Sequence, residues 1–141
     1  MNYQYQMEEA RDYLQERADD YHIKVRWAHL SPITPPGSSY EYRSVVMNYD
    51  WHHPREIIFQ FAHELAHVIH GDKGDIYYYH ACFTGRESVE YKANLGAVKL
   101  LVPYYCQHRN RESINAYEFE TLFNVPTYLN DVVIKELRNY Y

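Results

Sequence analysis

Apolar and charged residues alternate at helical spacing over the first part of the chain, between about residues 6 and 21. Residues three or four positions apart share one face of a helix, so this pattern predicts an amphipathic helix. Its apolar face would be formed by Met7, Ala10, Leu14, Ala18 and Tyr21. We interpret this segment as a packing helix in preference to a partner-binding surface.

The next two segments have the composition of β-strands. Residues 23–27 alternate apolar and polar side chains, which is typical of a strand with one buried face. Residues 31–38 are rich in Pro, Ser and Gly and predict a loop, and residues 39–49 form either one long strand or two short ones. We therefore expect a small antiparallel sheet. Its edge either accepts an extended peptide or is an ordinary edge shielded by Tyr and Arg side chains.

The strongest helical pattern lies between Pro54, which suits the first turn of a helix, and Gly71, which suits the position just past its end. The apolar sector of this helix would be about 200° wide at about 100° per residue. The opposite side carries few of the residues expected at a surface and holds instead His63, Glu64, His67 and His70. The helix should therefore be buried on one side and line a cleft on the other.

His63, Glu64 and His67 form a His-Glu-x-x-His pattern on this helix. Residues four apart lie on one helical face with Cβ atoms about 5–6 Å apart, so both imidazoles can bind one zinc ion. Glu64 would sit beside the metal, where a carboxylate can act as general base on a metal-activated water molecule. The alternative is a core helix whose histidines are satisfied by hydrogen bonds alone.

A second long helix is predicted from residue 87 to residue 102, with Pro103 as its end. Glu90 falls in the middle of its apolar face, where an unpaired carboxylate would be costly. As third ligand beside His63 and His67, it would complete a His₂Glu zinc site that leaves a fourth position for water. Asn94, one turn later, could orient a ligand histidine. The alternatives are an ion pair for Glu90 and a local helix contact for Asn94.

Other polar residues near the pattern are weaker candidates. We interpret His52 and His53 as surface or capping residues in preference to ligands. His70 could contact substrate or ligand groups, although binding to the last helical carbonyls suits its position better. A peptidase also needs a donor that stabilises the oxyanion formed from the scissile carbonyl. By location alone, the candidates for that role are Tyr77, Tyr78, Tyr79 and His80.

The C-terminal part, residues 113–141, is predicted to form a helix, a turn and a second helix. Asn115 with Glu118 matches a capping box, and Thr127 is placed to cap the last helix. The shape invites a DNA-binding interpretation, but this segment is acidic and poor in base-reading side chains. We expect a structural or protein-docking role instead.

Composition supports one soluble domain over residues 1–141. Hydrophobic residues make up 46 % of the chain, and 17 of its residues are Tyr. The formal net charge of −5 argues against direct nucleic-acid binding. Cys82 and Cys106 show no zinc-type spacing and are expected to be reduced thiols. With no signal segment and no span long enough for a membrane, we expect a cytoplasmic protein.

Three motifs together resemble the ImmA/IrrE family of small bacterial and phage metallopeptidases. They are HELAHVIHGD from His63, Glu90-Tyr-Lys-Ala-Asn94, and Leu100-Leu-Val-Pro103. The resemblance covers most of the chain. Gly96 departs from it, since the family usually has a large apolar residue there. A glycine should either loosen the second helix or leave room beside the site.

The resemblance implies a peptidase with a narrow target, a helix-turn-helix repressor of a phage or mobile element. It leaves open a mode in which such a protein binds the repressor without cutting it. We therefore expect an α+β zincin-like domain with a small sheet beside a helical bundle, holding zinc through His63, His67 and Glu90 with Glu64 as general base. The alternatives are a non-catalytic zinc-containing antirepressor and, less favoured, a DNA-binding regulator.

Overall fold

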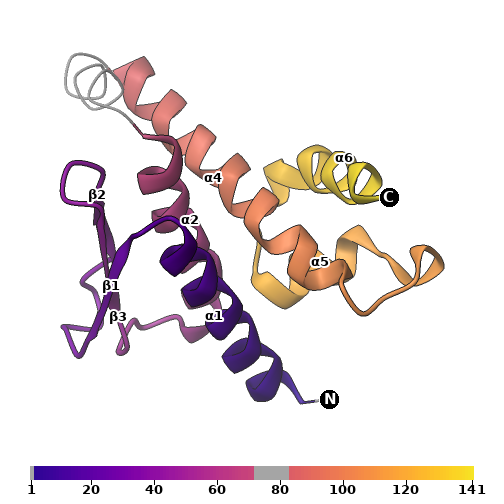
Figure 1. The fold of residues 1–141 in the computed structure, drawn as a ribbon, viewed down its shortest axis with the longest axis horizontal. Helices are drawn as coiled ribbons and strands as arrows, with labels where there is room; N and C mark the ends of the chain where they lie inside the picture. Colours follow the sequence, from indigo (N-terminus) through magenta and orange to yellow (C-terminus); the bar gives the residue numbers. More distant parts are fainter. Residues whose placement is uncertain (1, 72–82) are drawn as a thin grey trace.

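The computed structural model describes the backbone of residues 2–71 and 83–141 (Figure 1). Within these ranges the chain is a mixed α+β structure, which confirms the predicted class. The helices are α1 (Tyr3–Asp20), α2 (Ile57–His70), α4 (Phe83–Cys106), α5 (Ala116–Phe123) and α6 (Asn130–Tyr140). The strands are β1 (Lys24–Ala28), β2 (Gly37–Ser39) and β3 (Ser44–Asn48), and short 3₁₀ turns are η1 (Pro54–Glu56), η2 (Arg111–Ser113) and η3 (Thr127–Leu129).

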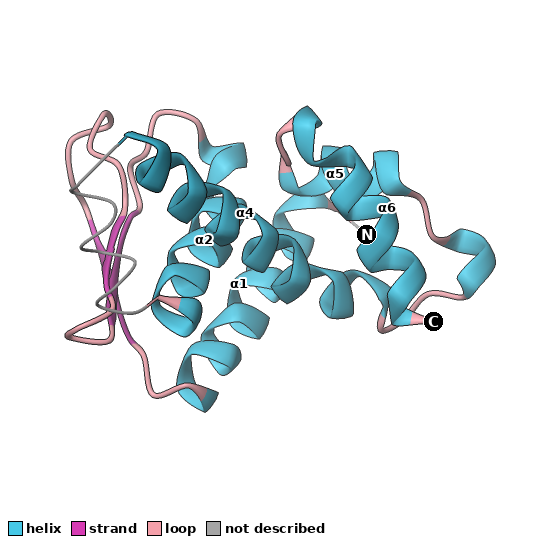
Figure 2. Ribbon diagram, turned by 90° about the horizontal axis from the view of Figure 1, so that it is seen from above, coloured by secondary structure: helices cyan, strands magenta, loops and turns pink. Residues whose placement is uncertain are grey.

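The sheet and the C-terminal helices lie on opposite sides of a central group of helices. Figures 1 and 2 both show the three strands on one side of α1, α2 and α4, with α5 and α6 on the other. Helix α2 contacts β2, β3, α1 and α4. These contacts bury the apolar side of α2, where four side chains have no exposed surface: Phe61, Ala62, Leu65 and Val68. The helix that carries the histidines is therefore held from several directions.

The sheet is mixed, which corrects the antiparallel expectation. Its strand order is β1-β3-β2, with β2 antiparallel to β3 and β1 parallel to β3. The loop at residues 29–36 reverses the chain after β1, and the turn at residues 40–43 reverses it again after β2. Two reversals leave β3 running in the same direction as β1, and β3 then inserts between the other two strands. Residues 39–49 were predicted to form one long strand or two short ones, but they contain one short strand, β3, and only the last residue of β2. The rest of β2 lies in the segment that was predicted to be a loop.

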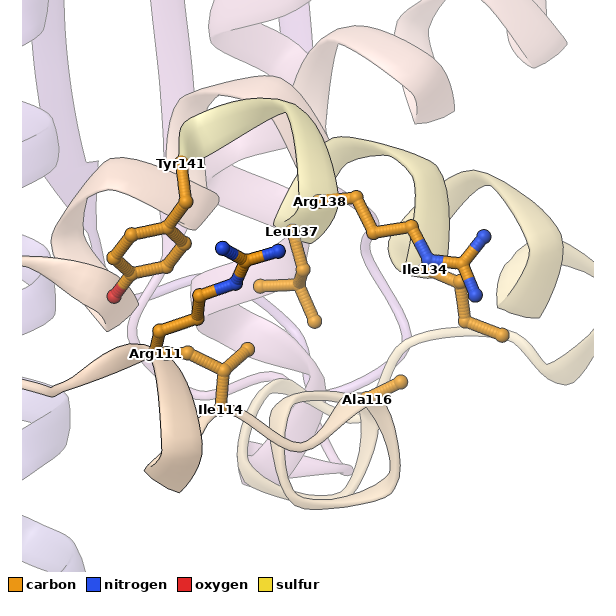
Figure 3. A pocket seen from close by; sticks show the side chains of 7 residues that line it. All are labelled: Arg111, Ile114, Ala116, Ile134, Leu137, Arg138 and Tyr141. Atoms are coloured by element: carbon orange, nitrogen blue, oxygen red, sulfur yellow. The ribbon is translucent and has the colours of Figure 1, made fainter.

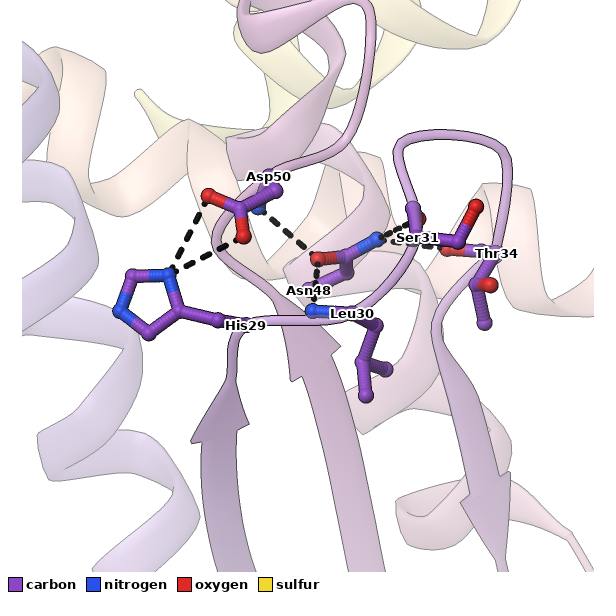
Figure 4. A network of polar contacts seen from close by, with 6 residues as sticks. All are labelled: His29, Leu30, Ser31, Thr34, Asn48 and Asp50. Carbon is purple, nitrogen blue, oxygen red and sulfur yellow. Dashed lines mark hydrogen bonds and ion pairs between the residues drawn. The ribbon is translucent and has the colours of Figure 1, made fainter.

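A buried asparagine holds the loop between β1 and β2 in place. Asn48, 1 % exposed, accepts hydrogen bonds from the backbone N–H groups of Leu30 and Asp50 at 3.1 and 2.8 Å. Its Nδ2 donates to the carbonyl oxygens of Ser31 and Thr34 at 2.7 and 3.0 Å (Figure 4). The Asn48 side chain thus supplies hydrogen bonds to backbone groups that have no strand or helix partner in this irregular loop.

Helix α4 runs past Pro103, where the sequence predicted its end. A proline removes one backbone donor and usually breaks a helix. Here the following turn is retained to Cys106, and Gln107 N–H donates to the carbonyl of Pro103 at 3.0 Å. Tyr105 is fully buried and Cys106 is 2 % exposed. Burial of these side chains favours continuation of the helix over termination at the proline.

The other helix ends differ less from expectation. Helix α2 ends at His70 and Gly71 follows it as predicted, and a Cβ at Gly71 would lie 2.3 Å from the carbonyl oxygen of His67. Asn115 caps α5 by accepting from Glu118 N–H at 3.0 Å. Thr127 does not cap α6, because it opens η3 and the helix begins only at Asn130.

Gly96 allows close contact between α4 and α2. A Cβ built on Gly96 would lie 2.6 Å from the Cβ of Ala66 and 3.2 Å from Cδ2 of His70. The glycine therefore does not leave a space, which corrects that part of the expectation. It brings the backbone of α4 against α2 at the level of the histidines, and so sets the distance across which Glu90 must reach.

Candidate metal centre

Three side chains from two helices converge on one point. Nε2 of His63 lies 3.1 Å from Oε2 of Glu90, and Nε2 of His67 lies 3.0 Å from Oε1 of Glu90. Each residue offers one donor atom, and these atoms all lie within 4.8 Å of one another. The structure thus brings together the three residues that the sequence indicated as ligands.

The local structure explains the convergence. His63 and His67 lie one turn apart on α2, and their ring centroids are 4.7 Å apart with the rings nearly perpendicular at 86°. Glu90 lies in the first half of α4 and crosses to them because Gly96 keeps the two helices close. Both histidine side chains are mostly covered, with 15 % and 19 % exposed. All three residues of the site therefore lie on helices and none lies on a loop.

The donor set fits a zinc ion. Two nitrogen or oxygen donors bound to a tetrahedral zinc lie roughly 3.4 Å apart, given metal–donor distances of about 2.0–2.2 Å. The separations of 3.0 and 3.1 Å between the imidazole and carboxylate donors need only a small outward movement to match this value. Two imidazoles and one carboxylate are also the ligand types of catalytic zinc sites.

The charges in the site favour an ionised carboxylate. Hydrogen bonds with His63 and His67 hold the pKa of Glu90 well below its usual value. Burial would lower the pKa of His63, but the hydrogen bond to Glu90 and the nearby charge of Glu64 raise it overall. The Glu90 side chain is 47 % exposed, so the predicted burial of this carboxylate is only partial. Pairing with the histidines distinguishes it more clearly than burial does.

Glu64 lies beside His63, His67 and Glu90 and is not part of this group. Its Oε1 accepts a hydrogen bond of 2.7 Å from the Ser38 hydroxyl on β2. Burial raises the pKa of Glu64 above its usual value, while the Ser38 bond and the charges of His63 and His67 oppose the rise. A carboxylate whose pKa is raised is a stronger proton acceptor than an ordinary one, which suits a general base.

The other ring nitrogen of His63 is also engaged. Nδ1 of His63 lies 2.7 Å from Oδ1 of Asn94, which fits donation by the ring N–H to the amide oxygen. This tautomer leaves the lone pair of Nε2 directed to the point where a metal could bind. Nδ2 of Asn94 in turn donates to the hydroxyl of Tyr128 in η3. Asn94 therefore occupies the orienting position that the sequence indicated.

The remaining sequence candidates lie outside this group. His70 is exposed at the end of α2 and is not among the three converging ligands. Nδ1 of His52 contacts the carbonyl oxygen of Pro32 at 2.9 Å, as a surface residue would, and His53 is exposed. Cys106 is a free, buried cysteine. The candidates that lie outside the described residues are Tyr77, Tyr78, Tyr79, His80 and Cys82.

Two residues that contact the site escaped the sequence analysis. Ser38 belongs to a breaker-rich segment, and Tyr128 is one of many tyrosines near a predicted turn. Neither position carries a local pattern that points to Glu64, 26 residues away, or to Asn94, 34 residues away. Only the packing of β2 and η3 against the helices reveals these contacts.

A separate pocket lies in the C-terminal part, between η2 and α6. Its volume is about 350 Å³, and Figure 3 shows an apolar floor with two guanidinium groups above it. None of the metal-site residues lines it. The lining side chains are Arg111, Ile114, Ala116, Ile134, Leu137, Arg138 and Tyr141.

Comparison with known proteins gives one match. The family model described as the IrrE N-terminal-like domain, a peptidase family, matches residues 7–128. This range includes α2, α4, the three converging ligands and Tyr128. No curated protein matches the chain, and no solved structure matches it. Among the helices that the structure describes, none is both long and apolar enough to cross a membrane.

Proposed function

Because the chain belongs to the family of the IrrE N-terminal-like domain, a family of peptidases, we propose that it is a zinc-dependent endopeptidase. The observation that carries the proposal is the convergence of His63, His67 and Glu90, whose donor atoms lie within 4.8 Å of one another. Glu64 is the second support, because a protein that only stored metal would not need a carboxylate at that position.

Each residue of the site has a different role in the proposed peptide hydrolysis. His63, His67 and Glu90 would hold zinc, which polarises the scissile carbonyl and acidifies a water molecule. Glu64 takes the proton of the attacking water and delivers it to the leaving amine. Since Ser38 donates to Oε1 of Glu64, the second oxygen stays available for this transfer.

The sheet supports an extended peptide as substrate. β2 is an edge strand, and it carries Ser38, which contacts Glu64. A peptide that adds to this edge as a further strand would run past the general base. This favours an endopeptidase, because an extended chain can continue beyond the site in both directions.

The target that we propose is a helix-turn-helix transcriptional repressor of a phage or mobile element, acted on in the cytoplasm. This is the substrate class that the sequence resemblance implies. The acidic chain supports a protein target over direct DNA binding, since a net charge of −5 disfavours contact with phosphates. An antirepressor that binds the repressor without cleaving it is the second candidate.

The first test is metal analysis of the wild type and of Glu90→Ala, purified without histidine tags. We expect about one zinc per chain in the wild type and a much weaker site in the variant, because removal of one ligand leaves two imidazoles. A wild type that takes up no zinc even when it is supplied would contradict the proposal.

The second test separates cleavage from binding. Glu64→Gln keeps the size of the side chain but removes the base, so it should retain zinc and lose cleavage of the proposed repressor substrate. The products are measured by mass spectrometry. Cleavage by the variant at the wild-type rate would overturn the role of Glu64. Loss of repressor–DNA binding with an intact repressor, in wild type and variant alike, would establish the antirepressor.

A further inference from the structure

A chain of hydrogen bonds joins the C-terminal part of the protein to the candidate metal centre. The Tyr128 hydroxyl accepts a hydrogen bond from Nδ2 of Asn94. Oδ1 of the same amide lies 2.7 Å from Nδ1 of His63, and Nε2 of His63 faces Glu90. One amide on α4 therefore connects a ligand on α2 with a tyrosine in η3.

Both ends of the Asn94 amide matter for His63. When an imidazole binds a metal through one nitrogen, a hydrogen bond from the other nitrogen sets the tautomer and the ring orientation and so strengthens metal binding. An amide bonded at one end alone can swing about its side-chain torsions. The bond to Tyr128 opposes this movement and keeps Oδ1 directed at the ring.

We propose that Tyr128 is a positioning residue for the metal ligand His63. Its hydroxyl holds the Asn94 amide, and through that amide the imidazole, in the orientation that zinc binding requires. The inference rests on the proposed zinc site. It gives the turn between α5 and α6 a role in the metal centre beyond packing.

The position of Tyr128 allows its hydroxyl to be removed without damage to the core. Its side chain is exposed, with 64 % of the residue accessible, whereas the next residue in η3, Leu129, is fully buried. Leu129 therefore anchors the turn, and Tyr128 contributes mainly its hydrogen bond. A Tyr128→Phe variant should fold like the wild type.

The test compares zinc affinity in Tyr128→Phe with that in wild type and in Tyr117→Phe. Tyr117 is a matched control, because it is an exposed tyrosine in the same C-terminal part whose hydroxyl makes no hydrogen bond to the residues that the structure describes. Zinc dissociation constants are measured by competition with a chromogenic chelator. We expect Tyr128→Phe to bind zinc about 3- to 10-fold more weakly, below the 10- to 100-fold loss found for groups that bond a ligand directly. Tyr117→Phe should match wild type.

A second measurement separates positioning from general stability. Thermal unfolding of the metal-free proteins should give the same midpoint for Tyr128→Phe and wild type. Asn94→Ala removes the amide through which Tyr128 acts, so Tyr128→Phe should have no further effect on zinc affinity in that background. The same fold-loss in both backgrounds would overturn the proposal, as would a lower midpoint of the metal-free Tyr128→Phe protein without a change in zinc affinity.

The outcomes also distinguish this inference from the function on which it rests. A wild-type protein that binds no zinc overturns both. A wild type that binds zinc and cleaves its target, with Tyr128→Phe equal to Tyr117→Phe in zinc affinity, overturns the role of Tyr128 and leaves the peptidase assignment intact.

Discussion

Ser38 and Glu64 are joined by a hydrogen bond of 2.7 Å across 26 positions of the chain. Ser38 lies on the edge strand β2, and Glu64 lies on α2, the helix that carries the two histidines proposed as metal ligands. The bond ties the proposed general base to the edge along which a substrate peptide would lie. Strand β2 therefore completes the sheet and also holds the Glu64 carboxylate through Ser38.

Replacement of Ser38 by alanine should shift the pH dependence of peptide cleavage. The Ser38 hydroxyl lowers the pKa of Glu64 against the effect of burial, which raises it. Without the hydroxyl the pKa of Glu64 rises further. Because a base must be deprotonated to act, the acidic limb of the kcat/KM profile should move to higher pH, while zinc content stays unchanged. Ser113→Ala, at an exposed serine in η2, is the control. An unchanged acidic limb would argue against this coupling.

Gly96→Ala should weaken both the fold and the metal site. The added Cβ would lie 2.6 Å from the Cβ of Ala66, so α2 and α4 must separate. Such overpacking typically costs about 1–3 kcal/mol, more than the roughly 1 kcal/mol that alanine gains over glycine in a helix. Separation also moves Glu90 away from the histidines, so zinc affinity should fall together with the urea unfolding midpoint.

Gly37→Ala is the matched control for that experiment. A Cβ at Gly37, the first residue of β2, would meet nothing within 4 Å. Its stability and zinc affinity should stay close to those of the wild type. If the Gly96 and Gly37 variants have the same stability and zinc affinity, the contact between α2 and α4 at Gly96 is looser than described here.

Asn48→Ala should destabilise the protein by about 2–4 kcal/mol in urea unfolding, because it removes a buried side chain together with its four hydrogen bonds to the backbone. The side chain makes four hydrogen bonds to backbone groups of the loop after β1 and of the turn after β3. By contrast His29→Ala removes an exposed contact with Asp50 (3.1 Å) and the stacking of the His29 ring on Tyr49, so it should change stability by only about 1 kcal/mol. A loss of similar size in both variants would contradict the special role of Asn48.

Tyr105 should make the protein sensitive to alkali. Burial, with the hydrogen bond to Glu118, raises the pKa of this phenol to about 12. In the unfolded chain the pKa of a tyrosine is about 10. The folded state therefore keeps a proton that the unfolded state releases, so this contribution is complete below about pH 10 and is lost as the pH rises towards about 12.

The corresponding measurement compares wild type with Tyr105→Phe in urea unfolding at several pH values. The variant lacks the titrating group as well as its hydrogen bonds. The difference in unfolding free energy between the two proteins should be largest below about pH 10 and shrink above it. A difference that stays constant up to about pH 12 would show that Tyr105 does not titrate in this way.

Local pattern alone indicated the positions of the helices and the three residues that converge in the candidate site. A period of three to four residues marks a helix directly, and two histidines four positions apart must share a helical face whatever the rest of the chain does. Glu90 and Asn94 could be found for the same reason, since an acidic residue in an apolar stripe stands out within its own helix. These features depend on contacts between residues close together in the chain.

Tertiary structure decided the features that depend on distant contacts. The direction of β1 relative to β3 follows from two chain reversals, and the continuation of α4 through Pro103 follows from burial of Tyr105, neither of which leaves a local signal. The link from Ser38 to Glu64 and the chain of hydrogen bonds from Tyr128 to His63 also require elements that meet only in the folded protein. Residue spacing along a chain specifies a helical face, but only packing of whole elements specifies what that face meets.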